Sequence, residues 1–230
     1  MLFVKNNEIE GVIFDIDGTI IDSLSLYHSC FNHGLEGVGI QSVPKDILYG
    51  YLGMSMSLKD ILRKIISDDK DAHVIEKAAE EILDQFKKVD MEIQLLPGVR
   101  EIFLFLKTEK IRIGLATGRT SSATYERERL KKKGLDGFID AIVTSAEVEN
   151  RKPAPDVIIA CATKLDVEIN KCLAIGDSVS DIHAARSAGA IPVGVSTGIE
   201  GSSKLEEHNP EEVLEVIDKL MDLLNRFPEK

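Results

Sequence analysis

The sequence predicts an α/β protein, with a doubly wound parallel sheet and an all-helical module inserted after the first strand. Three observations predict this fold. Five short apolar runs lack the alternation of half-exposed strands, helical patterns separate the later runs, and residues 24–92 show only helical periodicity. Strand and helix alternating in this order is typical of a parallel sheet covered by helices on both faces.

The predicted strands are short runs of Val, Ile, Leu and Ala. Such runs are typical of strands that are buried on both faces. They cover residues 11–15, 111–117, 141–144, 172–177 and 191–195.

The predicted helices of the sheet-forming part follow an apolar spacing of three and four residues. One ends at Gly134 and another at Gly189, because glycine suits the residue after a helix, and a third begins after Lys-Pro-Ala-Pro. They cover residues 99–106, 125–133, 154–165 and 181–188, with a last apolar stripe from Val213 to Leu224.

The inserted segment is too long to be a simple crossover between two strands. Apolar residues recur at helical spacing through residues 24–35, 58–65 and 74–86, and Ser57 with Asp60 resembles a capping box. We therefore expect three parts along the chain: residues 1–23 as the first part of the core, 24–92 as a helical cap, and 93–230 as the second part of the core.

Composition limits the partners of the protein. The 230 residues contain 28 Lys and Arg against 39 Asp and Glu, so the net charge is −11. This charge disfavours nucleic acids and anionic membranes, which are polyanions. Three cysteines without CxxC spacing, no signal-like N-terminus and no membrane-length apolar run favour a reducing cytoplasm. The sequence leaves monomer and dimer open.

Polar residues follow the predicted strands where their carboxyl ends meet at one edge of the sheet. In open α/β sheets ligands bind at this edge. The residues concerned are Asp15 and Asp17 after the first strand, Thr117, Gly118 and Arg119 after the second, Lys152 past the third, and Asp177 and Asp181 after the fourth.

These residue types suit a phosphate ester and a divalent cation. A carboxylate that attacks a phosphate dianion meets repulsion, which Mg²⁺ bound by oxygen ligands offsets. Asp15 and Asp177 are the candidate ligands, with Asp181 behind them. Lys152 supplies a fixed positive charge, and Thr117 and the N–H of Gly118 can donate to phosphoryl oxygens.

The two neighbouring carboxylates suggest a division of labour. Asp15 is positioned to attack phosphorus and form an aspartyl-phosphate. Asp17 lies two residues on, and an extended backbone would aim it to the same side, where it would protonate the leaving oxygen and later deprotonate water. Gly18 allows the turn that follows.

These motifs resemble those of the haloacid dehalogenase superfamily, in order and in context. They are Asp15-Ile16-Asp17-Gly18-Thr19, Thr117, Lys152, and Gly176-Asp177-Ser178 with Asp181; the phrases LLPGV, RKPAPD and GDSVSDIHAARSAGA resemble its phosphoglycolate phosphatase and β-phosphoglucomutase branch. The resemblance implies a Rossmann-like core, a C1-type helical cap and a Mg²⁺-dependent phosphatase acting through an aspartyl-phosphate. It also implies that the backbone carbonyl of Asp17 binds the metal.

Two differences from particular members of the family indicate which reaction to expect. Dehalogenase members lack the second acid, so Asp17 indicates phosphoryl chemistry. The β-phosphoglucomutases carry a histidine early in the cap, where this chain has Tyr27, with His28 one place off. We therefore expect hydrolysis of a small phosphorylated metabolite, similar to phosphoglycolate or a sugar phosphate, with specificity contacts around residues 53–57.

Several alternatives stay open from the sequence. A β-phosphoglucomutase-like phosphotransferase or a phosphonate-cleaving relative is the nearest, and a non-catalytic phosphate-binding module is the alternative outside the enzyme class. Residues 117–119 are Thr-Gly-Arg, where phosphatases more often have Thr-Asn-Lys, so the role of Arg119 has two alternatives. This side chain adds a second cation near the phosphate or faces solvent.

Overall fold

The computed structural model describes residues 1–54, 56–66 and 72–224. It divides into two compact units, one made of residues 1–22 and 94–230 and the other of residues 23–93. The sequence places these two boundaries after residues 23 and 92. Each unit is described by itself below.

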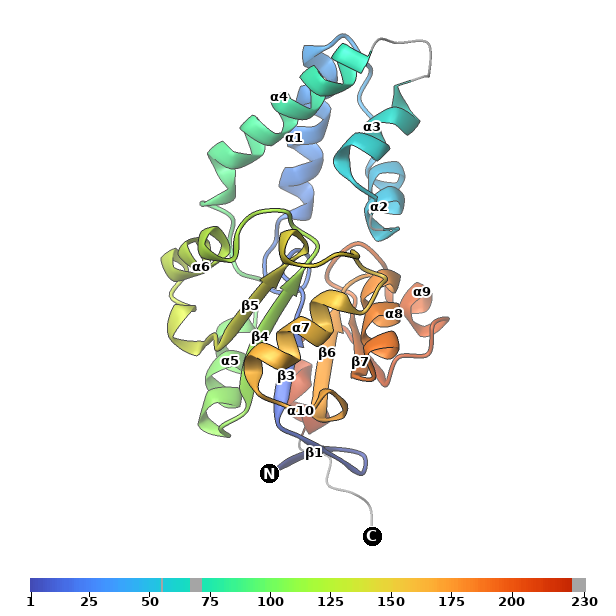
Figure 1. The fold of residues 1–230 in the computed structure, drawn as a ribbon. Coiled ribbons are helices and arrows are strands. Elements are labelled where there is room, and N and C mark those ends of the chain that lie inside the picture. The colour runs from blue at the N-terminus through green and yellow to red at the C-terminus, as the bar shows by residue number, and fades with distance from the viewer. Residues whose placement is uncertain (55, 67–71, 225–230) are drawn as a thin grey trace. The chain divides into compact units, whose positions relative to one another are not determined.

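The larger unit is built on a six-stranded parallel sheet in the order β5-β4-β3-β6-β7-β8 (Figure 1). The predicted doubly wound, Rossmann-like α/β arrangement is confirmed. The strands are β3 (Gly11–Phe14), β4 (Arg112–Thr117), β5 (Ala141–Thr144), β6 (Cys172–Gly176), β7 (Ile191–Val195) and β8 (Glu212–Leu214).

Helices cover both faces of this sheet. On one face, Ile13 of β3 packs in a buried cluster with Cys161 of α7 and Ala184 of α8. The next residue, Phe14, points to the other face, because side chains alternate along a strand, and its ring lies 5.1 Å from that of Phe103 on α5. The helices are α5 (Val99–Thr108), α6 (Ala123–Lys132), α7 (Asp156–Leu165), α8 (Val179–Ala188), α9 (Ser202–Glu206) and α10 (Leu220–Leu224), with 3₁₀ turns η1 (Asp136–Phe138), η2 (Ser145–Glu147), η3 (Ile169–Lys171) and η4 (Ile217–Lys219).

The strand order puts the first core strand in the middle of the sheet. From β3 the chain adds β4 and β5 on one side and β6 to β8 on the other. The direction of winding therefore reverses beside β3, and in such sheets ligands bind outside the carboxyl ends of the strands at this reversal. The residues that follow β3, β4 and β6 are thus brought to one place.

Two parts of the larger unit differ from the sequence prediction. The apolar stripe from Val213 to Leu224 is not one helix, because Val213 and Leu214 pair with Gly194 and Val195 as the edge strand β8 before η4 and α10 begin. An antiparallel hairpin, β1 (Leu2–Val4) and β2 (Asn7–Ile9), precedes the sheet and was not predicted. Both strands are only three residues long, too short to show a period.

The smaller unit contains only helices among its described residues. Their apolar faces form one cluster, which includes Phe31, Leu35, Leu48, Ile61 and Ile82. Ser57 begins the third helix, where its side chain accepts the N–H of Asp60 at 3.2 Å. The helices are α1 (Leu24–Gly37), α2 (Lys45–Gly53), α3 (Leu58–Ile65) and α4 (Ala72–Asp90). The helix α2 was not predicted, and Ser55, in the expected specificity loop, lies outside the described residues.

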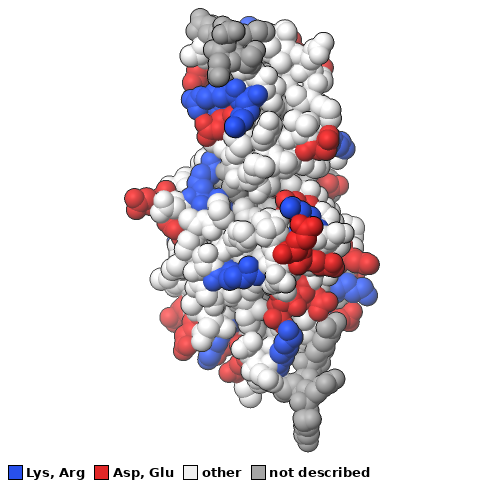
Figure 2. Space-filling model, turned by 90° about the vertical axis from the view of Figure 1, so that its right-hand side faces the viewer, with Lys and Arg blue, Asp and Glu red and all other residues white. Residues whose placement is uncertain are grey.

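The surface carries charges of both signs. Figure 2 shows one face of the molecule, on which acidic side chains are spread widely and, among the described atoms, Lys and Arg form no broad patch. No helix in the described part of the chain combines the length and the apolar character needed to cross a membrane.

Asp140 joins the start of β5 to β4. Its N–H donates to Ile113 O at 2.8 Å, and its carboxylate accepts the Ile113 N–H at 2.9 Å, with Lys107 and Arg112 beside it. Burial by itself raises the pKa of Asp140, but these hydrogen bonds and positive charges outweigh burial and lower it below 3.8. A lowered folded-state pKa means that the carboxylate stabilises the fold above pH 3.8, and that this contribution is lost as pH falls through the lowered value.

We predict that Asp140→Asn lowers the free energy of unfolding by about 1 kcal/mol at neutral pH, because the charge that strengthens these hydrogen bonds is removed. Urea unfolding at neutral pH and at a pH below the lowered pKa of Asp140 measures this difference. It should shrink in acid, where the unmodified Asp140 also becomes neutral. The control is Asp136→Asn in an exposed pair with Arg127, and a loss that is the same at both pH values would contradict the prediction.

Candidate active site

The loop after β3 holds Asp15 and then turns sharply. The Asp15 N–H donates to Ile175 O at 2.8 Å, which continues the pairing of β3 with β6 by one residue. Gly18 adopts a φ of 75°, a conformation that favours glycine, and its N–H donates to Ile21 O at 2.9 Å. Asp15 is therefore fixed by the sheet, whereas Asp17 belongs to the turn.

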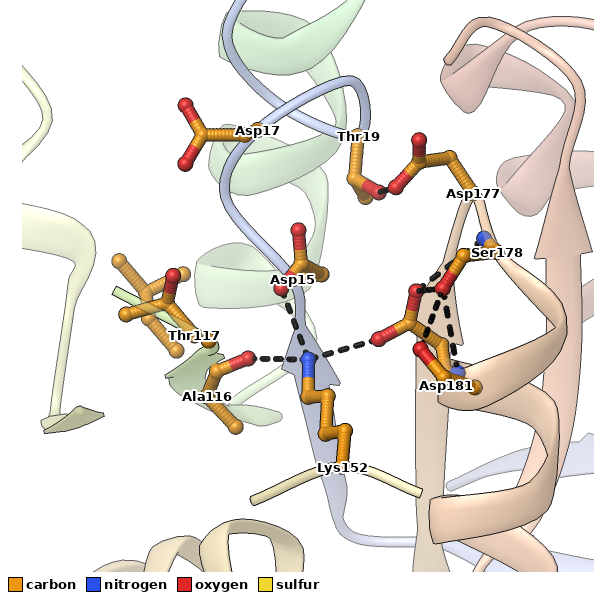
Figure 3. A network of polar contacts seen from close by, with 12 residues as sticks. Asp15, Asp17, Thr19, Ala116, Thr117, Lys152, Asp177, Ser178 and Asp181 are labelled. Carbon is orange, nitrogen blue, oxygen red and sulfur yellow. Dashed lines mark hydrogen bonds and ion pairs between the residues drawn. The ribbon is translucent and has the colours of Figure 1, made fainter. Parts of the chain in front are cut away.

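Lys152 lies at the centre of the site and is only 5% exposed. It belongs to the segment between η2 and α7, and its ammonium group lies 2.7 Å from Asp15 Oδ1, from Asp181 Oδ1 and from Ala116 O (Figure 3). An ammonium group has three protons to donate, and here it has three acceptors. One side chain thus joins the carboxyl ends of β3 and β4 to the start of α8.

The charged side chains around Lys152 shift one another's pKa values. Burial alone would lower the pKa of Lys152, but the carboxylates of Asp15 and Asp181 outweigh it and raise the pKa above its ordinary value. For Asp15, burial raises the pKa; Lys152 opposes this, while Asp181 and Asp17 add to it. The lysine therefore stays charged, whereas the pKa of Asp15 is raised to about 7.

Asp177 is held between two loops. Its Oδ2 accepts the N–H of Ile199 at 2.6 Å, and Thr19 donates to its Oδ1 at 3.4 Å. A side chain on Gly198 would overlap the Asp177 carboxylate, so only glycine allows this close approach. Burial, with the nearby charges of Asp181 and Asp15, raises the pKa of Asp177 well above its usual range.

Asp181 both caps the start of α8 and forms an ion pair with Lys152. Its Oδ2 accepts from the N–H and the hydroxyl of Ser178, at 3.1 and 2.5 Å, and the Asp181 N–H donates to the Ser178 hydroxyl oxygen at 3.3 Å. This reciprocal arrangement is a capping box. Because its Oδ1 pairs with Lys152, both oxygens of Asp181 are engaged in this structure.

The donor set fits a hard divalent cation. Of the three buried or nearly buried carboxylates, Asp15 and Asp181 share the Lys152 ammonium group, and no Lys or Arg of the described chain forms an ion pair with Asp177. Within the described residues, no three acidic, histidine or cysteine side chains form a ready-made metal cluster. Mg²⁺ commonly takes one or two carboxylates and completes its shell with substrate and water, which suits Asp15 and Asp177.

Thr117 and Gly118 are held in place from β5 and the loop that follows it. Thr117 is 1% exposed, and its hydroxyl oxygen accepts the Arg119 N–H at 3.2 Å. The Gly118 carbonyl accepts from Ser145 Oγ and from Arg151 Nη2, both at 2.9 Å. The sequence predicted Thr117 and Gly118 as donors but did not identify the supporting role of Ser145.

Arg119 does not face solvent, which was one of the two alternatives for it. Its Nε and Nη2 lie 2.5 and 2.7 Å from the two carboxylate oxygens of Asp17, and the side chain is 15% exposed. Asp15 and Asp17 therefore contact different cations: the dashed contact to Lys152 in Figure 3 comes from Asp15, whereas Asp17 pairs with Arg119.

Two fully buried charged side chains of α6 lie next to the ion pair between Arg119 and Asp17. Glu126 and Arg129 are 0% exposed and lie 3.3 Å apart, and both approach the Arg119–Asp17 pair. Burial raises the pKa of Glu126, although Arg119 and Arg129 oppose the shift. The role of Glu126 and Arg129 was not predictable from the sequence, because they stand in a highly charged helix and such helices are usually exposed.

Comparison with known proteins gives a consistent result. The model of the haloacid dehalogenase-like hydrolase family matches residues 12–195. The chain is 29% identical over 225 residues to a protein named pyrophosphatase PpaX from Bacillus mycoides, covering 96% of this chain and 99% of that protein. It is 28% identical over 230 residues to a phosphorylated carbohydrates phosphatase from Thermotoga maritima, covering 92% and 100%.

A solved structure is similar over nearly the whole chain. The crystal structure of a hydrolase from Pseudomonas syringae superposes with a TM-score of 0.78 at 28% identity, covering 95% of this chain and 99% of that one.

We predict that Lys152→Met, measured by urea unfolding in the presence of a chelator, lowers the free energy of unfolding by about 3 kcal/mol, because two buried carboxylates lose their counter-charge. Adding Asp181→Asn to the same chain should recover part of this loss, since one of the two orphaned charges is then removed.

Lys204→Met is the matched control, because Lys204 forms an exposed pair with Glu207 and should change stability by less than about 1 kcal/mol. Equal losses for Lys152→Met and Lys204→Met would show that the buried ammonium is not needed for the fold.

Proposed function

Because this chain belongs to the haloacid dehalogenase-like hydrolase family, we propose that it is a Mg²⁺-dependent phosphatase that hydrolyses a small phosphorylated metabolite through an aspartyl-phosphate on Asp15. The observation that carries the proposal is the position of Asp15. This carboxylate lies at the reversal of the sheet, is almost buried, and has one oxygen held 2.7 Å from a buried ammonium group.

In the first half of the reaction a carboxylate oxygen of Asp15 attacks phosphorus. The new bond joins Asp15 to phosphorus, and the bond from phosphorus to the leaving oxygen breaks. Asp17 gives its proton to that oxygen, which departs as an alcohol. Lys152, the Thr117 hydroxyl and the Gly118 N–H face the negative charge of the phosphoryl oxygens, as pre-placed donors do in phosphoryl transfer.

In the second half water attacks the phosphorus of the aspartyl-phosphate. Asp17, now a carboxylate, accepts the proton of the attacking water, and the bond between phosphorus and Asp15 breaks. Inorganic phosphate leaves, Asp15 is again a carboxylate, and Asp17 is again protonated for the next cycle.

Asp15, Asp177 and the backbone carbonyl of Asp17 are the proposed ligands of Mg²⁺, with Asp181 close behind. When bound, the cation offsets the negative charges that meet when a carboxylate approaches a phosphate. The support from this chain is the raised pKa of both Asp15 and Asp177, whose shared causes are burial and neighbouring acids. Asp17 contributes its carbonyl only, because Arg119 engages both oxygens of its side chain.

The substrate class comes from the relatives. Their names specify pyrophosphatase and phosphorylated carbohydrates phosphatase, and both imply small substrates with a terminal phosphoryl group. We propose the same class for this chain, with phosphoglycolate and sugar phosphates as the first compounds to screen.

Hydrolysis is favoured over a mutase reaction by the state of His28. This histidine is the cap residue nearest to the mutase position, and its Nε2 lies 2.8 Å from Val43 O and 3.0 Å from Asn32 Nδ2. The ring is thus engaged within its own unit. Tyr27 packs on Phe86, with ring centroids 5.2 Å apart.

A cytoplasmic location, as a monomer or dimer without nucleic-acid or membrane partners, completes the proposal. Its support is the net charge of −11 and the three cysteines, all free and buried.

We predict that Asp15→Asn and Asp17→Asn each lower kcat for p-nitrophenyl phosphate hydrolysis by at least about 10²-fold, because the first variant loses the nucleophile and the second loses the base that accepts the proton of the attacking water. The unmodified protein should lose activity on chelation and regain it with Mg²⁺. Phosphate release and circular dichroism measure activity and folding.

Asp46→Asn, a change in the first turn of α2, is the control and should keep full activity. Near-normal turnover by a folded Asp15→Asn variant would overturn the mechanism.

A further inference from the structure

Asp17 belongs to a closed ring of four charged side chains, with Arg119, Glu126 and Arg129. Arg119 holds both oxygens of Asp17, at 2.5 and 2.7 Å. Behind it, Arg119 Nη1 lies 3.8 Å from Glu126 Oε1, and Glu126 Oε2 lies 3.3 Å from Arg129 Nε. Arg129 Nη2 closes the ring at 3.8 Å from Asp17 Oδ1. Three separate segments, the β3 loop, the β4 loop and α6, are joined in this way.

The ring is electrically balanced and mostly buried. Two guanidinium groups face two carboxylates, and exposure falls from 26% at Asp17 and 15% at Arg119 to 0% at Glu126 and Arg129. Ser121 adds a 2.5 Å hydrogen bond to Glu126 Oε1. Because the charge of Arg119 is already matched within the ring, little of it remains to attract a substrate anion. This speaks against the alternative that Arg119 is a second phosphate-binding cation.

A bidentate guanidinium fixes a carboxylate in angle as well as in distance, which an ammonium group does not. Asp17 stands in a turn and is the most exposed member of the ring, and the ring contacts of its carboxylate come from Arg119 and Arg129. Glu126 is anchored on α6, where it pairs with Arg129, and it approaches Arg119 from its buried side. The orientation of Asp17 is thus set from outside its own loop.

We propose that Arg119 is the positioning residue of Asp17, and that Glu126, itself paired with Arg129, holds Arg119 in the orientation that this requires. The proposal rests on the phosphatase function proposed above, in which Asp17 carries the proton of the leaving oxygen. A residue that acts through Asp17 matters most where the leaving group needs that proton. An alkoxide needs it, whereas p-nitrophenolate leaves readily without it.

The experiment compares two substrates, glycerol phosphate and p-nitrophenyl phosphate. It follows kcat/KM, which reports the steps up to formation of the aspartyl-phosphate. We expect Arg119→Met to lower kcat/KM by roughly 10²-fold for glycerol phosphate and by no more than about threefold for the aryl ester, in line with the usual contribution of general acid catalysis. Arg119→Lys, which keeps the charge without the paired contact, should fall between Arg119→Met and the unmodified protein.

Two further variants test the chain of contacts. Glu126→Gln should show the same bias between the substrates as Arg119→Met, in weaker form. Arg127→Met is the matched control, because Arg127 lies on the same helix in an exposed pair with Asp136 and should leave both substrates unaffected. Circular dichroism and thermal unfolding check each fold, and Arg119→Lys decides the question if Arg119→Met does not fold.

The outcomes separate this inference from the proposed function. Equal losses on both substrates in folded variants would overturn the positioning role and indicate a phosphate-binding or structural one. A rise in glycerol phosphate turnover would also overturn it, because the ion pair would then restrain Asp17 from reacting. If the unmodified protein hydrolyses neither ester with Mg²⁺ present, the proposed function itself fails.

Discussion

The buried ammonium group of Lys152 is the constraint on which the site depends. A charged group that is 5% exposed is tolerable only with full compensation, and Lys152 has three acceptors at 2.7 Å. These acceptors come from the end of β3, from β4 and from α8. To satisfy one lysine, the fold must bring these three segments together where the winding of the sheet reverses, which is also where a ligand binds in sheets of this kind.

The two acids that follow β3 contact different positively charged side chains. Asp15 faces Lys152, whereas Asp17, two residues on, faces Arg119 (Figure 3). The two environments differ in kind. The first holds more carboxylates than cations and so suits a metal ion, while the ring around Asp17 is balanced by its own arginines. The proposed division between nucleophile and proton carrier thus rests on which cation each carboxylate contacts.

The sequence predicted the parts of this arrangement that local pattern determines. The buried strands and the acids after them are local features, and Asp15, Thr117, Lys152 and Asp177 all lie at the predicted edge of the sheet. The partner of Arg119 was not predictable, because Asp17 is 102 residues away and its direction depends on a turn. The burial of Glu126 and Arg129 was also not predictable, because the sequence of their helix is highly charged and typical of an exposed helix. The edge strand β8 was missed because only its pairing with β7 distinguishes it from a helix.

The central claim is that Asp15 carries the phosphoryl group during turnover. The most direct test mixes the protein with p-nitrophenyl phosphate and Mg²⁺, quenches the reaction in acid within the first turnover, and locates the added phosphoryl group by peptide mass spectrometry. The account predicts phosphorylation of Asp15, formed no later than the nitrophenol is released. A phosphoryl group on another residue, or nitrophenol release in a first turnover that leaves every peptide unmodified, would contradict it.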